Sequence, residues 1–110
     1  MELRIAEVNR TCVIGLSGRL DMQSSPDLRS VALTRCARGQ CKKLTIDFDR
    51  VSYIDTSGLA TLLEILVAAR EQKAQLTLSG VNEKVQYLLD VNGLTSFFRI
   101  ETPARERSPA

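Results

Sequence analysis

The sequence predicts an α/β domain with a mixed, mostly parallel sheet of four to five strands and helices packed mainly on one face. Short β-rich runs alternate along the chain with apolar stripes of helical spacing, in the order β-β-α-β-α-β-α-β. A helix between two strands is a crossover connection, so the later strands are expected to be parallel neighbours. The chain has 110 residues, which suits one domain with a single core.

The chain opens with two predicted strands, residues 2–8 and 11–18, which can pair as an antiparallel hairpin. The turn-like pair Asn9-Arg10 separates the two β-rich runs. The sequence Gly18-Arg19-Leu20-Asp21 then leaves the second strand through a loop. These residues therefore predict the antiparallel edge of the mixed sheet.

A first helix follows this loop. Ser24 or Ser25 can serve as its N-cap, with Pro26 at the first helical position and Asp27 behind it. Gly39 is expected to end the helix. The predicted buried face of this helix consists of Leu28, Val31, Ala32 and Cys36.

The middle of the chain repeats the alternation of strand and helix. A strand is expected at 43–48, followed by a short polar linker, a helix over roughly 57–73 and a strand at 75–79. The second helix carries one apolar face with helical spacing, formed by Leu59, Leu62, Leu63, Leu66 and Val67.

The last elements are short. Asn82 is expected to cap a third helix, which Asn92-Gly93 closes. A small helical turn and a last strand around 97–100 complete the domain, which is predicted to span residues 1–101. Residues 102–110 contain two prolines and no apolar stripe, which predicts a disordered C-terminal tail.

Composition narrows the function classes. Hydrophobic residues make up 44% of the chain and charged residues 25%, as in ordinary soluble globular proteins, and the formal charge is +2. The basic residues are mostly dispersed, so no nucleic-acid partner is expected. No apolar run reaches the roughly 18 residues of a membrane span, and the N-terminus has no hydrophobic signal region. We therefore expect a cytoplasmic protein without direct membrane insertion.

The three cysteines are expected to be reduced, inert thiols. Cys36 and Cys41 are a lone pair and the chain has no histidine, so no metal site is predicted, and no cofactor is expected. The lack of histidine also excludes a Ser-His-Asp triad, and neither a P-loop nor nucleophile-elbow spacing is present. The sequence therefore does not predict an independent catalyst.

The most informative run is Ile54-Asp55-Thr56-Ser57-Gly58-Leu59, at a strand-to-helix junction. A hydroxyl side chain there can accept hydrogen bonds from the free N–H groups of the first helical turn, so Thr56 or Ser57 is a natural N-cap. The same helix end carries about half a positive charge and accommodates anions. A serine here, between an acidic residue and a glycine, is well placed to carry a phosphate. Ser57 is favoured over Thr56 as the phosphoacceptor.

The element order, Gly18-Arg19-Leu20-Asp21 after the second strand, and Asp55-Thr56-Ser57-Gly58-Leu59 before the second helix resemble the STAS domain of bacterial anti-sigma factor antagonists. The resemblance covers about residues 2–101. It implies a small cytoplasmic binding module that is not a catalyst, and we expect a monomer or a weak dimer. In that family an anti-sigma factor with a GHKL-type serine kinase domain phosphorylates the serine before the glycine, which is Ser57 here.

The resemblance also implies a partner-switching cycle. The unphosphorylated antagonist binds the anti-sigma factor, which then releases its sigma factor. Phosphorylation of Ser57 breaks this complex, and a PP2C-type phosphatase restores the antagonist. The expected partner-binding residues around the site are Asp21, Asp55, Thr56, Gly58 and Leu59.

Two questions stay open at the level of sequence. Asp21 and Asp55 either add to the negative field of a phosphate or orient the serine hydroxyl, while Gly58 also suits close packing and Leu59 a core position. The second question is the partner, because STAS modules also serve as regulatory subunits of membrane-lipid transport ABC ATPases, which they grip with the same loop and helix. A nucleotide or lipid ligand is a third possibility, for which no dedicated pocket residues are seen.

Overall fold

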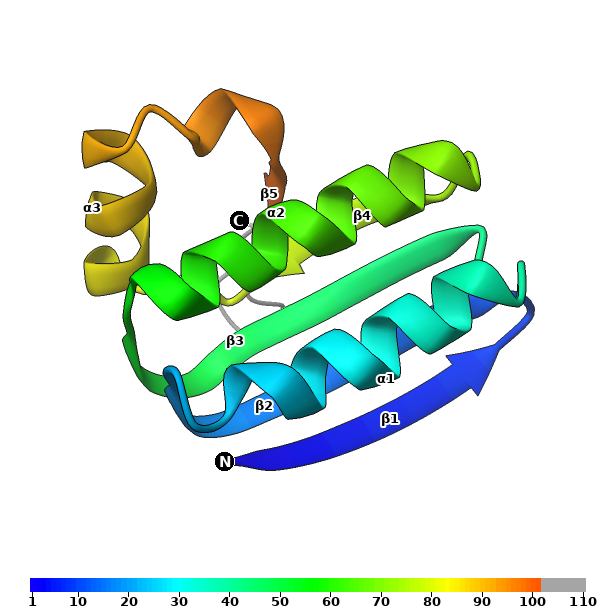
Figure 1. The fold of residues 1–110 in the computed structure, drawn as a ribbon, viewed down its shortest axis with the longest axis horizontal. Helices are drawn as coiled ribbons and strands as arrows, with labels where there is room; N and C mark the ends of the chain where they lie inside the picture. The colour runs from blue at the N-terminus through cyan, green and yellow to red at the C-terminus, as the bar shows by residue number, and fades with distance from the viewer. Residues whose placement is uncertain (102–110) are drawn as a thin grey trace, which may run out of the picture.

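The computed structural model describes residues 1–101, and the predicted tail at 102–110 lies outside the described residues. Figure 1 shows the arrangement of the strands and helices. In chain order they are β1 (Glu2–Val8), β2 (Thr11–Leu20), α1 (Ser25–Ala37), β3 (Lys43–Ile54), α2 (Thr56–Glu71), β4 (Gln75–Ser79), α3 (Glu83–Val91), the 3-10 turn η1 (Thr95–Phe97) and β5 (Arg99–Glu101). This order confirms the predicted α/β class.

All five strands join one sheet in the order β1-β2-β3-β4-β5. β1 pairs antiparallel with β2, and the other neighbouring strands are parallel. Asn9 and Arg10 form the hairpin turn with φ of 50° and 65°, the left-handed region that a type I′ turn requires. α1 and α2 lie side by side over one face of the sheet, and α3 stands at the end where α2 begins (Figure 1). The mixed sheet covered mainly on one face is as predicted.

The core lies between this face of the sheet and the two long helices. Its largest fully buried side chain is Phe48 of β3. From α2, the buried apolar residues are Leu59, Leu62, Ile65, Leu66 and Ala69. Val67 was expected on this face, but its side chain is 55% exposed, so that prediction is wrong. The buried face of α2 is centred on Leu62, Ile65 and Ala69, and at about 100° per residue Val67 lies on the opposite side of the helix.

β2 and β3 are longer than predicted. The expected polar linker after residue 48 belongs to β3, which continues to Ile54 alongside the end of β2 at Leu20. Two register shifts between the strands interrupt the regular pairing here. Such irregularities break the alternation of buried and exposed residues, which hid the strand from pattern analysis. Burial of Val51 and Ile54 anchors the extension.

α3 is capped as predicted. The Asn82 side chain accepts a hydrogen bond from the backbone N–H of Val85 at 2.9 Å, and its amide group donates to the Val51 carbonyl at 3.0 Å. The same side chain thus starts α3 and fastens it to β3.

In residues 1–101 no helix combines the length and apolar character that a membrane span requires.

Cys12 and Cys41 form a disulfide, so the prediction of reduced thiols is wrong for these two residues. Cys12 lies at the start of β2 and Cys41 just before β3, and the parallel pairing of these strands brings the two cysteines together. Cys36 is free and buried, and burial raises the pKa of its thiol. The disulfide joins residues 29 positions apart, a pairing that only the tertiary structure reveals.

Candidate functional site: the start of α2

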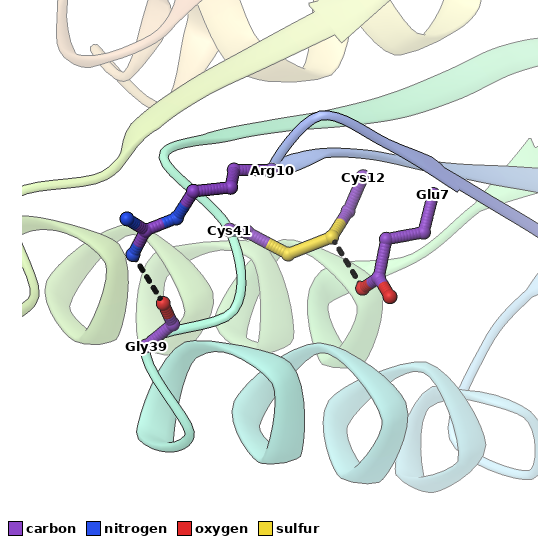
Figure 2. The surroundings of a disulfide bond; sticks show 5 residues. All are labelled: Glu7, Arg10, Cys12, Gly39 and Cys41. Carbon is purple, nitrogen blue, oxygen red and sulfur yellow. Dashed lines mark hydrogen bonds between the residues drawn. A yellow bond between two sulfur atoms is a disulfide. The ribbon is translucent and has the colours of Figure 1, made fainter.

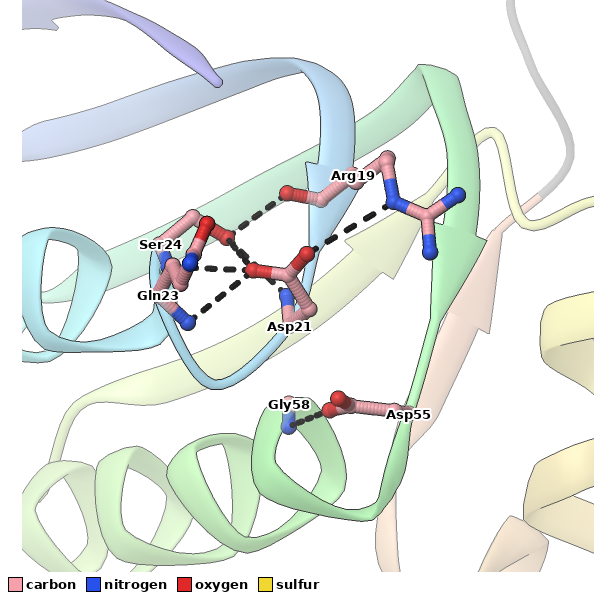
Figure 3. A network of polar contacts seen from close by, with 6 residues as sticks. All are labelled: Arg19, Asp21, Gln23, Ser24, Asp55 and Gly58. Carbon is pink, nitrogen blue, oxygen red and sulfur yellow. Dashed lines mark hydrogen bonds and ion pairs between the residues drawn. The ribbon is translucent and has the colours of Figure 1, made fainter.

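The candidate site lies where β2 and β3 end side by side. Leu20 pairs with Ile54 at the ends of these parallel strands. From there the chain continues as the loop that begins at Asp21 and as α2, which follows Asp55. The backbone N–H of Asp55 donates to the Leu20 carbonyl at 3.2 Å. The Asp21 loop and the first turn of α2 are therefore neighbours, as Figure 3 shows.

Asp55 is the N-cap of α2. Its backbone is extended, and its carboxylate accepts a hydrogen bond from the backbone N–H of Gly58 at 3.0 Å (Figure 3). The expectation that Thr56 or Ser57 caps the helix is therefore wrong, because these are the first two residues of the helix itself. An aspartate satisfies a free N–H group and also places a negative charge at the positive helix end.

Because Asp55 caps the helix, the hydroxyl groups of Thr56 and Ser57 are not needed as cap acceptors. Within residues 1–101, neither Thr56 nor Ser57 makes a side-chain hydrogen bond. Thr56 is exposed and Ser57 is half-buried. Ser57 stands in the first turn of α2, where the helix end favours anions. This geometry allows a phosphoryl group on the Ser57 oxygen without removing a hydrogen bond of the fold.

We predict that Asp55→Ala lowers the free energy of unfolding by about 1 kcal/mol, because the substitution removes the N-cap acceptor. Asp55→Asn keeps an acceptor and is expected to lose only a few tenths of a kcal/mol, since asparagine caps about as well as aspartate. Urea denaturation of the two variants and the wild type measures the difference. Equal midpoints for Asp55→Ala and the wild type would contradict the capping role.

Gly58 and Leu59 have packing positions. A Cβ atom on Gly58 would lie 2.8 Å from Cγ1 of Ile54 and 2.9 Å from the carbonyl oxygen of Leu20. Leu59 is 4% exposed and belongs to the core. Both residues bring the first turn of α2 close to the strand ends. Direct contact of either residue with a partner stays a prediction.

Gly58→Ala is expected to lower the free energy of unfolding by about 1–3 kcal/mol, as overpacking of a tight contact does. Alanine forms helices better than glycine, so a loss can come only from crowding. Ser57→Ala, one position earlier and half-buried, is the matched control and should unfold near the wild-type midpoint. A Gly58→Ala protein as stable as the wild type would show that the strand ends yield to the methyl group.

Asp21 organises the loop beside α2. Its Oδ1 accepts hydrogen bonds from the backbone N–H groups of Gln23 at 3.0 Å and Ser24 at 3.1 Å, and its Oδ2 lies 3.6 Å from Nε of Arg19 (Figure 3). These contacts, led by the Ser24 N–H, hold the pKa of Asp21 below its ordinary value. Asp21 is therefore a carboxylate at neutral pH. Neither it nor Asp55 hydrogen-bonds the Ser57 hydroxyl, which argues against the orienting role.

The structure adds a residue pair that the sequence did not reveal. The guanidinium of Arg19 lies 4.0 Å from the ring centroid of Tyr53, its neighbour across the β2–β3 pairing. Tyr53 is 40% exposed and Met22, in the adjacent loop, is 74% exposed. A cation over an aromatic ring is favourable and fixes both side chains. In the sequence, the only hint of this Arg19–Tyr53 contact was that Arg19 belongs to the motif Gly18-Arg19-Leu20-Asp21.

The site has a hydroxyl and carboxylates but no group of potential metal ligands. Among residues 1–101, the side chains close enough to share a metal ion are those of Glu7, Cys12 and Cys41. They lie where β2 and β3 start, at the opposite end of these strands from Ser57. Of the predicted residues, Asp21, Asp55, Thr56 and Ser57 keep solvent exposure where β2 and β3 end, while Gly58 and Leu59 are buried beneath them. Such a surface can present a serine for modification and bind another protein.

Comparison with known proteins places this geometry in context. The STAS domain family model matches residues 2–106. The anti-sigma-B factor antagonist of Staphylococcus aureus (strain NCTC 8325 / PS 47) is 25% identical over 87 residues, which is 79% of this chain and 80% of that protein. The intermembrane phospholipid transport system binding protein MlaB of Escherichia coli K12 is 47% identical over 49 residues, 44% of this chain and 50% of that protein.

Solved structures share the whole fold. The anti-sigma factor antagonist SpoIIAA in its unphosphorylated form superposes with a TM-score of 0.76 and 20% identity, covering 96% of this chain and 92% of that chain. The phosphorylated form of SpoIIAA, the Bacillus cell fate determinant, gives a TM-score of 0.78 and 22% identity, covering 96% and 94%. Both comparisons place the strands and helices in the same arrangement.

Proposed function

Because the chain belongs to the STAS domain family, we propose that it is an anti-sigma factor antagonist controlled by phosphorylation of Ser57. The unphosphorylated form binds an anti-sigma factor with a GHKL-type serine kinase domain, and the sigma factor is released. Phosphorylation of Ser57 breaks this complex, and a PP2C-type phosphatase reverses it. In this proposal the protein is a cytoplasmic binding module, and the kinase and phosphatase supply the chemistry.

The observation that carries the proposal is the free Ser57 hydroxyl at the positive end of α2. Asp55 performs the capping, so modification of Ser57 costs the helix none of its hydrogen bonds. A phosphate near an exposed helix N-terminus is stabilised by about 0.3–1 kcal/mol. The fold should therefore tolerate the modification.

Known relatives support this reading. The Staphylococcus aureus relative is named as an anti-sigma-B factor antagonist. SpoIIAA has been solved in phosphorylated and unphosphorylated forms, and the present fold is about equally similar to both. Within that protein, the fold persists when a phosphate is added.

Electrostatics explains how one phosphate can control binding. The modification adds about −1.5 to −2 charges. These charges come next to the loop of Asp21, whose carboxylate is ionised at neutral pH, and to the carboxylate of Asp55. Without the phosphate, the stacked side chains of Arg19 and Tyr53 are available to contact a partner at this surface. A partner that places acidic or apolar groups against Ser57 is expelled after phosphorylation.

The similarity to MlaB favours a second candidate, a regulatory subunit of a membrane-lipid transport ATPase. The matched segment is shorter, but its 47% identity is higher than the 25% of the other relative. Both candidates use the surface around Ser57 and differ in the partner that covers it.

Binding to purified candidates from the organism that encodes the chain tests the proposal. We expect isothermal titration calorimetry to show a 1:1 complex with an anti-sigma factor kinase and none with a lipid-transport ATPase. Met22→Asp, in the exposed loop, should weaken the complex at least tenfold, because it buries a charge against the partner. Binding to the ATPase alone would establish the second candidate.

A further inference from the structure

We propose that Cys12 and Cys41, once reduced, bind Zn²⁺ together with Glu7. These three side chains gather where β2 and β3 start, at the other end of these strands from Ser57 (Figure 2). The site therefore does not depend on the proposed function. Two thiolates and a carboxylate are ligands that Zn²⁺ accepts, and a water molecule can complete the tetrahedron.

The ligand atoms are close enough for one metal ion. All three lie within 4.8 Å of one another, and the Cα atoms of the two cysteines are 5.8 Å apart. Tetrahedral Zn²⁺, with Zn–S bonds of about 2.3 Å, holds its two sulfur ligands about 3.8 Å apart. Once the S–S bond is broken, rotation about Cα–Cβ is enough to separate the two sulfurs by this much.

Glu7 supplies the observation that points to a ligand. It is the register partner of Cys12 in the β1–β2 hairpin, so both side chains project from the same face of the sheet. Its Oε1 lies 3.0 Å from Sγ of Cys12, the geometry of a thiol-to-carboxylate hydrogen bond (Figure 2). A disulfide sulfur carries no proton to donate. The carboxylate is therefore placed for the reduced cysteine, or for a cation that replaces the thiol proton.

The backbone around the cysteines is held independently of the disulfide. The backbone N–H groups of Lys42 and Lys43 donate to the Arg10 carbonyl at 2.7 and 3.3 Å. The Arg10 guanidinium donates to the Gly39 carbonyl at 2.9 Å (Figure 2). These bonds fasten the loop that carries Cys41 to the hairpin turn that precedes Cys12. Reduction therefore leaves both thiols facing each other, and Glu7, on the exposed edge strand, gives the metal a route from solvent.

Zn²⁺ binding requires two steps, reduction of the disulfide and then replacement of the thiol protons by the metal ion. A dithiol reductant gives two electrons and two protons to the Cys12–Cys41 disulfide, so that the S–S bond breaks, two thiols form and the reductant becomes a disulfide. Zn²⁺ then displaces the two thiol protons, which pass to solvent, and forms two Zn–S bonds and one Zn–O bond. The oxidised protein has no thiolate ligands and cannot bind the ion in this way.

The test uses the full chain with Zn²⁺ and with Co²⁺ as a spectroscopic probe. The protein is reduced, freed of reductant under argon and titrated against a chromophoric chelator. The variants are Cys41→Ser and Glu7→Gln, and the matched controls are Cys36→Ser, the cysteine outside the cluster, and Glu2→Gln, an exposed glutamate on the same strand. All proteins are compared reduced, so the loss of the disulfide does not separate them.

We expect one Zn²⁺ per reduced chain, none per oxidised chain, and a thiolate-to-cobalt charge-transfer band with Co²⁺. Both controls should bind like the wild type, while Glu7→Gln should bind at least about tenfold more weakly and Cys41→Ser weaker still. Glu7 is exposed, so its variant should fold even if Cys41→Ser does not. The proposal is overturned if the reduced wild type binds no Zn²⁺, or binds it no more tightly than Glu7→Gln.

Discussion

Phosphorylated at Ser57, the protein is expected to bind its partner about 1,000-fold more weakly than the unphosphorylated form, a difference of about 4 kcal/mol. Two negative charges about 5 Å from one partner carboxylate repel it by roughly 5–7 kcal/mol at an effective dielectric of 20, before salt reduces the effect. A change from mostly bound to mostly free needs about 5 kcal/mol. Charge repulsion alone is therefore of the right size to operate the switch.

Titration calorimetry with phosphorylated and unphosphorylated protein measures this difference. Ser57→Ala should bind like the unphosphorylated wild type, and Ser57→Asp should bind more weakly, though less so than the phosphorylated form because aspartate carries less charge. Ser96→Asp, at an exposed serine in η1, controls for the added charge alone. Equal affinity of both phosphorylation states for the partner would reject repulsion as the mechanism.

Removal of the Cys12–Cys41 disulfide is expected to lower the free energy of unfolding by about 3–4 kcal/mol. The bond closes a loop between residues 29 positions apart, and the chain-entropy model gives this size of effect for such a loop. The loop contains all of α1, so its closure limits the unfolded chain across the first half of the domain.

Urea denaturation of Cys41→Ser and of the wild type, with and without a reductant, measures this contribution. The oxidised wild type should have the highest midpoint. The reduced wild type and Cys41→Ser, both without added metal, should lie close together at lower urea. If oxidised wild type and Cys41→Ser unfold at the same midpoint, the bond does not stabilise the native state.

The sequence predicted local structure best where a residue type strongly favours one position in a helix or turn. Pro26 near the start of α1, Asn82 as the cap of α3 and a turn at Asn9-Arg10 were all predicted from residue type, whereas the left-handed backbone of Arg10 was seen only in the structure. The order of strands and helices follows from the spacing of apolar residues. The meeting of Asp21 with the Ser57 run was expected only from the resemblance to the STAS domain, and in the structure both segments follow parallel strands that end at the same edge of the sheet.

The remaining features depend on contacts between distant segments. The continuation of β3 to Ile54 needs β2 as an irregularly paired neighbour, and the Cys12–Cys41 bond needs the two strands to start together. The cap of α2 was expected at Thr56 or Ser57, and the neighbouring Asp55 has a similar intrinsic preference for the N-cap position. In the structure Asp55 has the extended backbone of an N-cap residue and α2 begins at Thr56, so the Ser57 hydroxyl is not used for capping.

Locating the phosphate tests the central claim most directly. The wild type, Ser57→Ala and Thr56→Ala are each incubated with ATP and an anti-sigma factor kinase that binds the chain, and the products are mapped by mass spectrometry. We expect one phosphate on Ser57 in the wild type and in Thr56→Ala, and none in Ser57→Ala. A phosphate on Thr56 or on another residue, or a wild-type protein left unmodified by a kinase that binds it, would contradict the account.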